Sequence, residues 1–206
     1  MGKKLGLVQV YTGDGKGKTS AAIGLVTRAV GQGYKAHIIQ FMKGGAYTGE
    51  MISAKNFLPC TKFVQYGRPC IKEVKQMKLT GFDKKVPYFD YVRDDIDCGA
   101  CRWCFLNDKK QQQYIDEAYA KSKQIVSSGD YEIVVLDEIN IAVDLGFLSV
   151  EKVLGLIASK APHTELVLTG RNARSEIIQK ADLVTEMRMI KHYFQQGIGA
   201  RRGIEY

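Results

Sequence analysis

A glycine-rich segment that ends in Lys-Thr is the part of the sequence whose chemistry is easiest to infer. It reads TGDGKGKTS and lies between an apolar run, Leu5 to Tyr11, and a helical pattern that begins at Lys18. Glycines let the backbone curl so that its N–H groups point into one concavity, and the helix adds the positive end of its dipole. Lys18 brings a positive charge to bound phosphates, and the Thr19 hydroxyl suits Mg²⁺. The segment therefore predicts a nucleotide site formed by Thr12, Gly13, Asp14, Gly15, Lys16, Gly17, Lys18, Thr19 and Ser20.

This loop departs from the general phosphate-binding pattern at one position. The pattern G-x-x-x-x-G-K-[ST] would place a glycine at residue 12, where this chain has Thr12, and its first glycine is Gly13. The variant weakens the expectation of an ordinary transfer of the γ-phosphate.

A second chemical signal is an apolar run, Glu132 to Leu136, that is followed directly by Asp137 and Glu138. Parallel strands present their carboxyl ends to a common crevice, so a carboxylate there can hold Mg²⁺ beside the phosphates. The sequence therefore predicts that a carboxylate of this Asp-Glu pair holds Mg²⁺, directly or through water.

The elements that must position these residues follow from hydrophobic periodicity. Strands are expected at residues 5–11, 36–41, 61–66, 132–136, 165–169 and, as an edge strand, 183–189. Helices are expected at residues 18–30, 108–128, 149–159 and 175–181. Alternation of strands and helices predicts an α/β fold with a mostly parallel sheet flanked by helices. We expect one domain over residues 1–206, with a partly irregular, cysteine-containing insertion at about 45–107.

Composition narrows the classes of partner. The chain has 206 residues and a formal net charge of +8, which suits anionic ligands such as nucleotides but also fits a basic solvated surface. The apolar stretch after Met1 to Lys4 is too short for a signal peptide, and no apolar run approaches membrane-spanning length. We therefore expect a cytoplasmic protein.

The insertion contains all five cysteines, an odd number that argues against a disulfide framework. Cys98, Cys101 and Cys104 form a C-x₂-C-x₂-C pattern, whose thiolates could ligate one metal centre with Cys70 or Cys60 as the fourth ligand. A structural Zn²⁺, an Fe–S cluster and unligated thiols all remain open.

Several segments together resemble the P-loop type of corrinoid adenosyltransferase. They read TGDGKGKTSAAIGLVTRAVGQG, IIQFMKG, VVLDEINIAVDLGFL, LVLTGR and ADLVTEMRMIKHYFQQGIGARRGIEY. The similarity covers residues 5–44 and 131–206 in the same order. It implies a RecA-like P-loop NTPase fold, a homodimer, and ATP bound in the reverse sense from most P-loop enzymes. It also implies Mg²⁺ on Thr19 and Glu138, and nucleotide or corrinoid contacts from Lys18, Arg28, Arg171 and His192.

The activity that this resemblance implies is transfer of the 5′-adenosyl group of ATP to the cobalt(I) of a reduced corrinoid, with release of triphosphate. Cobalt(I) is a strong nucleophile, so the protein needs to align the reactants and stabilise the charge on the leaving group. A reductase or flavin would supply electrons. Familiar members displace the lower cobalt ligand with aromatic residues that follow the strand matching residues 61–66. Here the Phe/Trp pair is absent, and Tyr88, Phe89, Tyr91 and Trp103 could substitute.

Alternatives of other classes use the same motifs. A RecA-like ATPase acting on nucleic acid fits the charge, but no RNA-binding signature or stacking stripe is present. A nucleoside kinase would use the phosphate loop and a metal-bound cysteine segment, and it would release ADP. A non-catalytic sensor or corrinoid chaperone would bind both ligands without turnover. We expect ATP and a corrinoid as ligands, and neither nucleic acid nor a membrane as a partner.

Overall fold

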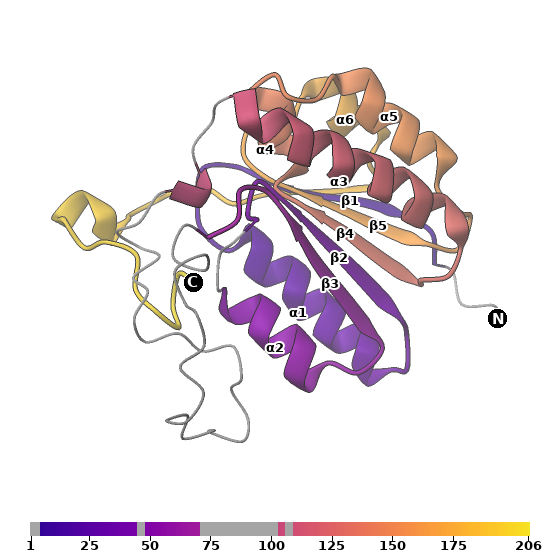
Figure 1. Cartoon of the computed structure of the whole chain (residues 1–206), viewed down its shortest axis with the longest axis horizontal. Helices are drawn as coiled ribbons and strands as arrows, with labels where there is room; N and C mark the ends of the chain where they lie inside the picture. The colour runs from indigo at the N-terminus through magenta and orange to yellow at the C-terminus, as the bar shows by residue number, and fades with distance from the viewer. Residues whose placement is uncertain (1–4, 45–47, 71–102, 106–108) are drawn as a thin grey trace.

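A parallel six-stranded sheet forms the centre of the molecule (Figure 1). The computed structural model describes residues 5–44, 48–70, 103–105 and 109–206. The strands are β1 (Val8–Thr12), β2 (Ala36–Phe41), β3 (Thr61–Tyr66), β4 (Ile133–Asp137), β5 (Glu165–Thr169) and β6 (Leu183–Glu186). Their order is β3-β2-β4-β5-β1-β6, and every neighbouring pair is parallel. The predicted α/β fold is confirmed.

Helices cover both faces of the sheet (Figure 1). One face carries α1 (Lys18–Gly31) and α2 (Gly49–Phe57). The other carries α3 (Lys109–Ser128), α4 (Ile139–Asp144), α5 (Val150–Ser159) and α6 (Ser175–Lys180). Short 3₁₀ turns lie at Trp103–Phe105 and Tyr193–Gln196. None of the helices that the structure describes is both long and apolar enough to span a lipid bilayer.

Residues of the central strands alternate between two cores. Ile38 and Val135 pack in the cluster that contains the α1 and α2 side chains, whereas Ile39 and Leu136 pack in the cluster that contains the α3 and α5 side chains. All four are fully buried. A strand buried on both faces is apolar at most positions, which is why β4 is apolar throughout up to Asp137 and β2 is apolar except at His37 and Gln40.

The sheet brings the carboxyl ends of β1, β4 and β5 to one edge. Tyr11 pairs with Thr169, and Leu136 pairs with Leu168, so the residues that follow these strands are neighbours. This edge is where open parallel sheets bind ligands.

Four elements differ from the sequence-based expectation, the first being β1, which was expected at residues 5–11 and begins at Val8. Helix α2 lies inside the segment that we expected to be irregular, and α4 follows Glu138 directly. Strand β6 ends at Glu186, earlier than expected, because the Met187 carbonyl accepts a hydrogen bond from Gly15 of the phosphate loop instead. Most of the predicted insertion lies outside the described residues.

Candidate active site

The phosphate loop has the geometry that its glycines suggest. It connects β1 to α1, with Gly13 at φ 97° and Gly17 at φ 110°, a region that favours glycine. The buried Lys18 ammonium donates to the carbonyl oxygens of Gly13 (2.7 Å) and Gly15 (2.6 Å). Burial lowers the pKa of Lys18, while the nearby Glu138 carboxylate opposes that shift. The ammonium therefore lies within the concavity of the loop.

Two of these glycines are also required by packing, which the sequence pattern did not reveal. A Cβ atom on Gly13 would lie 2.4 Å from the Met187 carbonyl oxygen, and one on Gly15 would lie 2.7 Å from the same atom. The Gly15 N–H donates to this oxygen at 2.6 Å, and the Met187 N–H donates to Thr12 O at 2.8 Å. The loop is thus seated directly on the segment that follows β6.

Asp137 is the centre of the hydrogen bonds beneath the loop. Its Oδ1 accepts from the hydroxyls of Thr19 (2.8 Å) and Thr169 (2.6 Å). Its Oδ2 accepts from Gln40 Nε2 (2.9 Å) and Lys43 Nζ (3.1 Å). Burial alone would raise the pKa of Asp137, but Lys43 and the hydroxyl donors outweigh burial and lower it. With both oxygens doubly occupied, this carboxylate orients Thr19 and has no lone pair left for a metal ion.

Glu138 is the carboxylate that faces outward. Its backbone is left-handed, with φ 63°, and its N–H donates to Thr169 Oγ1 at 3.0 Å. The side chain lines the cavity described below, and within the described part of the chain it has no hydrogen-bond partner. Burial raises the pKa of Glu138, against the lowering effect of Lys43 and Lys18. A bound cation would offset the free-energy cost that burial imposes on the charged form of this carboxylate.

Lys43 and Glu50 complete the site, and the sequence reading missed both. Burial alone would lower the pKa of Lys43, but Asp137, Glu138 and Glu50 together raise it. Gln40 Nε2 also donates to Glu50 Oε1 at 3.0 Å. Lys43 lies in the segment FMKG immediately after β2, which is the signal that could have identified it. Glu50 belongs to α2, a helix that the sequence did not predict.

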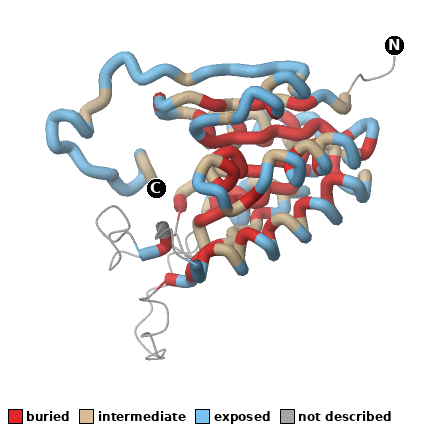
Figure 2. The backbone as a smooth tube through the Cα atoms, turned by 90° about the horizontal axis from the view of Figure 1, so that it is seen from above, coloured by how far each residue is buried: buried red, intermediate tan, exposed pale blue. Residues whose placement is uncertain are grey.

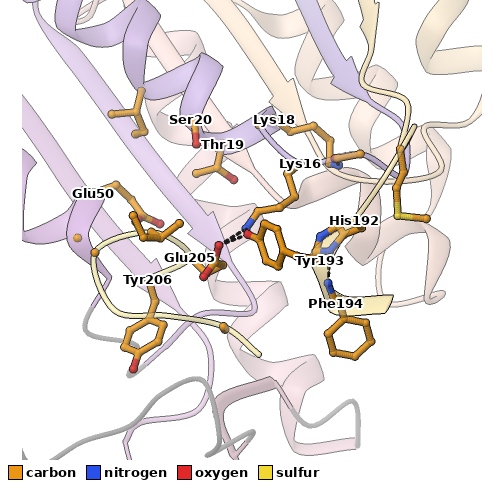
Figure 3. A pocket seen from close by; sticks show the side chains of 18 of the residues that line it. Lys16, Lys18, Thr19, Ser20, Glu50, His192, Tyr193, Phe194, Glu205 and Tyr206 are labelled. Atoms are coloured by element: carbon orange, nitrogen blue, oxygen red, sulfur yellow. Dashed lines mark hydrogen bonds and ion pairs between the residues drawn. The ribbon is translucent and has the colours of Figure 1, made fainter. Parts of the chain in front are cut away.

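These groups surround one large cavity of about 1470 Å³ (Figure 3). It is lined by the phosphate loop and α1 as far as Thr27, by Lys43, by the start of α2, and by Glu138 and Arg171. Its remaining wall comes from the chain after β6, which we call the tail (residues 187–206). Ser20 lines the cavity, whereas the Thr12 hydroxyl accepts a hydrogen bond from the Ala173 N–H at 3.1 Å instead.

The structure brings two of the three other predicted basic residues to this cavity. Arg171 follows β5 and lines it, and its charge acts on both Lys18 and Glu138. His192 lines it from the tail, and its Nδ1 accepts from the Phe194 N–H at 3.0 Å. Arg28 lies in the exposed last turn of α1, outside the cavity lining.

The predicted cysteine cluster lies mostly outside the described residues. Cys98 and Cys101 belong to the part that is not described, while Cys70 and Cys104 are buried and Cys60 is exposed. Among residues 5–44, 48–70, 103–105 and 109–206, no group of three or more His, Cys, Asp or Glu side chains could hold a metal ion. The Zn²⁺ or Fe–S site remains a prediction. Of the aromatic residues considered for the lower cobalt face, only Trp103 is described, with the Arg68 guanidinium 5.1 Å from its ring.

Residues 4–206 match the protein-family model described as "ATP:corrinoid adenosyltransferase BtuR/CobO/CobP". The chain belongs to this family. It is 33% identical over 203 residues to a corrinoid adenosyltransferase of a Sinorhizobium species, covering 98% of this chain and 80% of the relative. The corrinoid adenosyltransferases of Pseudomonas aeruginosa and Escherichia coli are each 32% identical over 201 residues, with 84% and 86% of their own lengths covered. The predicted family, fold class and transferase class are confirmed for this ATP:corrinoid adenosyltransferase.

Proposed function

We propose that this chain transfers the 5′-adenosyl group of ATP to the cobalt(I) of a reduced corrinoid and releases triphosphate, in adenosylcobalamin synthesis or salvage. The observation that carries the proposal is the pairing of two features at one cavity. A phosphate loop bears Lys18, and the fully hydrogen-bonded Asp137 orients Thr19 beside Glu138.

The polyphosphate of ATP would occupy the concavity of the loop. There the backbone N–H groups and the start of α1 face an anion, and Lys18 would exchange its carbonyl partners, Gly13 and Gly15, for phosphate oxygens. Because the polyphosphate is the leaving group in this reaction, the loop stabilises the charge that develops as the C5′–O bond breaks. Arg171 lies beside Lys18 and would add a second cation.

The residues present fit Mg²⁺. The Thr19 hydroxyl donates a hydrogen bond to Asp137, so its lone pairs are free to face a metal ion. Glu138 lines the same cavity with a carboxylate that has no hydrogen-bond partner among the described residues. Mg²⁺ typically takes one or two protein ligands and completes its shell with phosphate oxygens and water. When bound, the ion would neutralise charge on the triphosphate. The protein's own part is to hold Thr19 and Glu138 in place through Asp137.

No side-chain nucleophile is needed, because the reduced corrinoid supplies the attacking electron pair. The protein has to align C5′ with cobalt, which favours ATP bound with its ribose toward the open part of the cavity. His192 and Arg171 are proposed as contacts to nucleotide or corrinoid there, since both line the cavity. Arg28 lies at the exposed end of α1, so any contact that it makes with a ligand would be outside the cavity.

We also propose a homodimer in the cytoplasm that receives electrons from a flavin or a reductase. In the described part of the chain, β6 is an edge strand: it pairs with β1 on one side and has no neighbouring strand on the other. Its Leu183 and Val184 are exposed. A second copy could cover this edge. Size measurement by sedimentation equilibrium would test the dimer independently of the activity.

The activity is tested by mixing the protein with Mg-ATP and chemically reduced cob(I)alamin without oxygen and recording the visible spectrum. We expect a light-sensitive alkyl-cobalt spectrum to form with the native protein and with Lys123→Ala, an exposed lysine of α3 far from the cavity. Lys18→Ala should abolish the change, because it removes the cation from the loop. A native protein that leaves the cobalt spectrum unchanged would refute the proposal.

A further inference from the structure

The tail (residues 187–206) forms one wall of the active-site cavity yet has little contact with the core. Every tail residue is exposed or half-buried, and Figure 2 shows it as an exposed loop beside the buried strands of the sheet. Two backbone hydrogen bonds join its beginning to the phosphate loop, at Met187. Its last residue, Tyr206, approaches Gly49 at the start of α2, so the tail spans the cavity from one side to the other.

Glu205 holds the far part of the tail in place. Its carboxylate accepts from Lys16 Nζ (2.6 Å), from the Tyr193 hydroxyl, and from the Arg201 backbone N–H (2.6 Å). The Arg201 guanidinium donates to the same carboxylate at 3.3 Å. Lys16 Nζ donates a second hydrogen bond to the Tyr193 hydroxyl, at 2.6 Å. We call these four residues, Lys16, Tyr193, Arg201 and Glu205, the latch.

The latch is compact because two cations share one ring and one carboxylate. Arg201 lies 4.7 Å and Lys16 lies 5.1 Å from the centroid of the Tyr193 ring. Hydrogen bonds, chiefly those from Arg201, lower the pKa of Glu205, so the carboxylate stays charged at neutral pH. Charge-assisted hydrogen bonds of this kind are stronger than neutral ones.

The latch changes the expected role of Lys16. Its position within TGDGKGKT predicts a nucleotide contact, but its side chain points to Glu205 and Tyr193 rather than into the loop (Figure 3). Lys18 is the residue whose ammonium occupies the concavity. Lys16 can therefore face phosphate with its backbone N–H while its side chain holds the tail.

Beside polar residues such as His192 and Gln195, the tail presents apolar side chains to the cavity. Phe194 is 62%, Ile198 is 41% and Ile204 is 65% exposed, and all three line the cavity. The cavity, at about 1470 Å³, is larger than the roughly 300–1,000 Å³ of a pocket for one small ligand. ATP at the phosphate loop would leave the tail side unfilled. A corrin is a broad, mostly apolar ring, which suits such a wall.

We propose that residues 192–206 form the corrinoid-binding wall of this site, and that the Lys16–Glu205 pair positions that wall against the phosphate loop. The inference rests on the proposed function, because it assigns one of that reaction's two substrates to the tail. It makes Lys16 and Glu205 positioning residues for the corrinoid.

A double-mutant cycle tests the latch. Lys16→Gln, Glu205→Gln and the double variant are compared by their KM for ATP, their KM for cob(I)alamin, and direct binding of cob(II)alamin in equilibrium dialysis. Each single change should weaken corrinoid binding about two- to fivefold, the scale of a partly exposed charge pair, and the double change should add little more. The KM for ATP should change less than about twofold, because Lys18 and the loop amides are intact. Glu176→Gln, an exposed carboxylate on α6, serves as the control.

A second pair of variants tests the wall itself. Phe194→Ser should weaken cob(II)alamin binding, whereas Phe57→Ser should not. Phe57 is a comparably exposed phenylalanine, at 53%, that ends α2 and does not line the cavity. Neither side chain is buried, so both variants should fold like the native chain.

The outcomes separate the inference from the function. If the native protein alkylates cob(I)alamin but Glu205→Gln and Phe194→Ser bind cob(II)alamin normally, the wall and the latch are refuted while the activity stands. A rise in the KM for ATP alone in Lys16→Gln would identify Lys16 as a phosphate ligand and overturn the latch. If the native protein neither binds nor alkylates the corrinoid, both proposals fail.

Discussion

At the scale of single residues, the site depends on a carboxylate that is buried beneath the phosphate loop. Asp137 accepts hydrogen bonds from Thr19, Thr169, Gln40 and Lys43, and it is 1% exposed. An ordinary strand end would leave such a carboxylate solvated. Here it fixes the hydroxyl of Thr19 on one side and the ammonium of Lys43 on the other.

Replacing Asp137 by Asn should therefore damage both stability and metal use. The amide offers one acceptor oxygen where the carboxylate offers two, and it leaves the ammonium of Lys43 without its partner at 3.1 Å. We expect the free energy of unfolding to fall by about 2–4 kcal/mol, measured by urea denaturation. The apparent affinity for Mg²⁺ in the presence of ATP should fall as well.

The control for this change is Asp144→Asn. Asp144 ends α4 and pairs with the exposed Arg174 at 3.4 Å, so its loss should cost less than about 1 kcal/mol. Equal effects of the two substitutions would contradict the central place given to Asp137.

Gly15 offers a second test at this scale. A methyl group there would lie 2.7 Å from the Met187 carbonyl oxygen and 2.8 Å from the Arg188 carbonyl carbon, both backbone atoms. We expect Gly15→Ala to displace the tail from the loop and to raise the KM for ATP at least about tenfold, the change that corresponds to 1.4 kcal/mol. Steady-state kinetics would measure it.

Gly155→Ala is the matched control, and we expect it to stabilise the protein rather than to impair it. A Cβ atom at this position of α5 meets nothing within 4 Å. Alanine should stabilise the helix by about 0.5–1 kcal/mol and leave the kinetics unchanged. Impaired kinetics in Gly155→Ala, or native kinetics in Gly15→Ala, would show that the close approach at the loop is not what matters.

At the scale of elements, β2 carries a buried histidine away from the site. His37 is 2% exposed, and its ring packs edge-on against Tyr131 with centroids 4.9 Å apart. Within the described part of the chain, neither ring nitrogen has a hydrogen-bond partner. Burial, with smaller effects from Lys121 and Lys62, lowers the pKa of His37 from 6.5 to about 4.

This histidine should make the fold sensitive to acid. Between pH 6.5 and pH 4 the unfolded chain binds a proton at residue 37 and the folded chain does not. The free energy of unfolding therefore falls as the pH falls through this window, and it levels off below pH 4. The largest loss from this group is about 3 kcal/mol, at 1.36 kcal/mol for each pH unit. Urea denaturation at several pH values would measure it.

His37→Phe should flatten that part of the pH profile. His163, a second histidine that bonds to the Gly129 carbonyl at the surface, gives the control His163→Phe, which should keep the native slope. An unchanged slope in His37→Phe would mean that the acid sensitivity arises elsewhere.

The elements also show what the sequence could and could not predict. Strands β2, β4 and β5 were predictable because strands buried on both faces are apolar at most positions. The phosphate loop and Glu138 were predictable because their chemistry requires fixed spacing. Helix α2 was not, because its apolar face comprises little more than Met51 and Ala54. Glu50 was missed with it, and Glu205 was missed because nothing local to the sequence links it to Lys16.

At the scale of the whole molecule, ligand binding and folding should be coupled. The cavity is built from the loop, α2, the ends of β4 and β5, and the tail, so a ligand there joins parts of the chain that are far apart in the sequence. ATP with Mg²⁺ at 100 times its dissociation constant should stabilise the fold by about 2.7 kcal/mol. For a chain of this length that corresponds to a rise in Tm of roughly 5–10 °C.

The coupling should depend on the residues assigned to the metal and the phosphates. Calorimetry should show the rise in Tm for the native protein, a much smaller rise with EDTA present, and almost none for Lys18→Ala. A full rise with EDTA would argue that Thr19 and Glu138 do not hold a metal ion.

The central claim is that the bond broken in ATP is the one between C5′ and oxygen, with triphosphate leaving. It is tested most directly by ³¹P NMR of an anaerobic reaction containing Mg-ATP and cob(I)alamin, with the alkylated corrinoid counted from its light-sensitive spectrum. We predict one inorganic triphosphate for each corrinoid alkylated, and no ADP. ADP and orthophosphate in place of triphosphate, with the cobalt spectrum unchanged, would contradict the account and make the chain an ordinary phosphoryl-transfer enzyme.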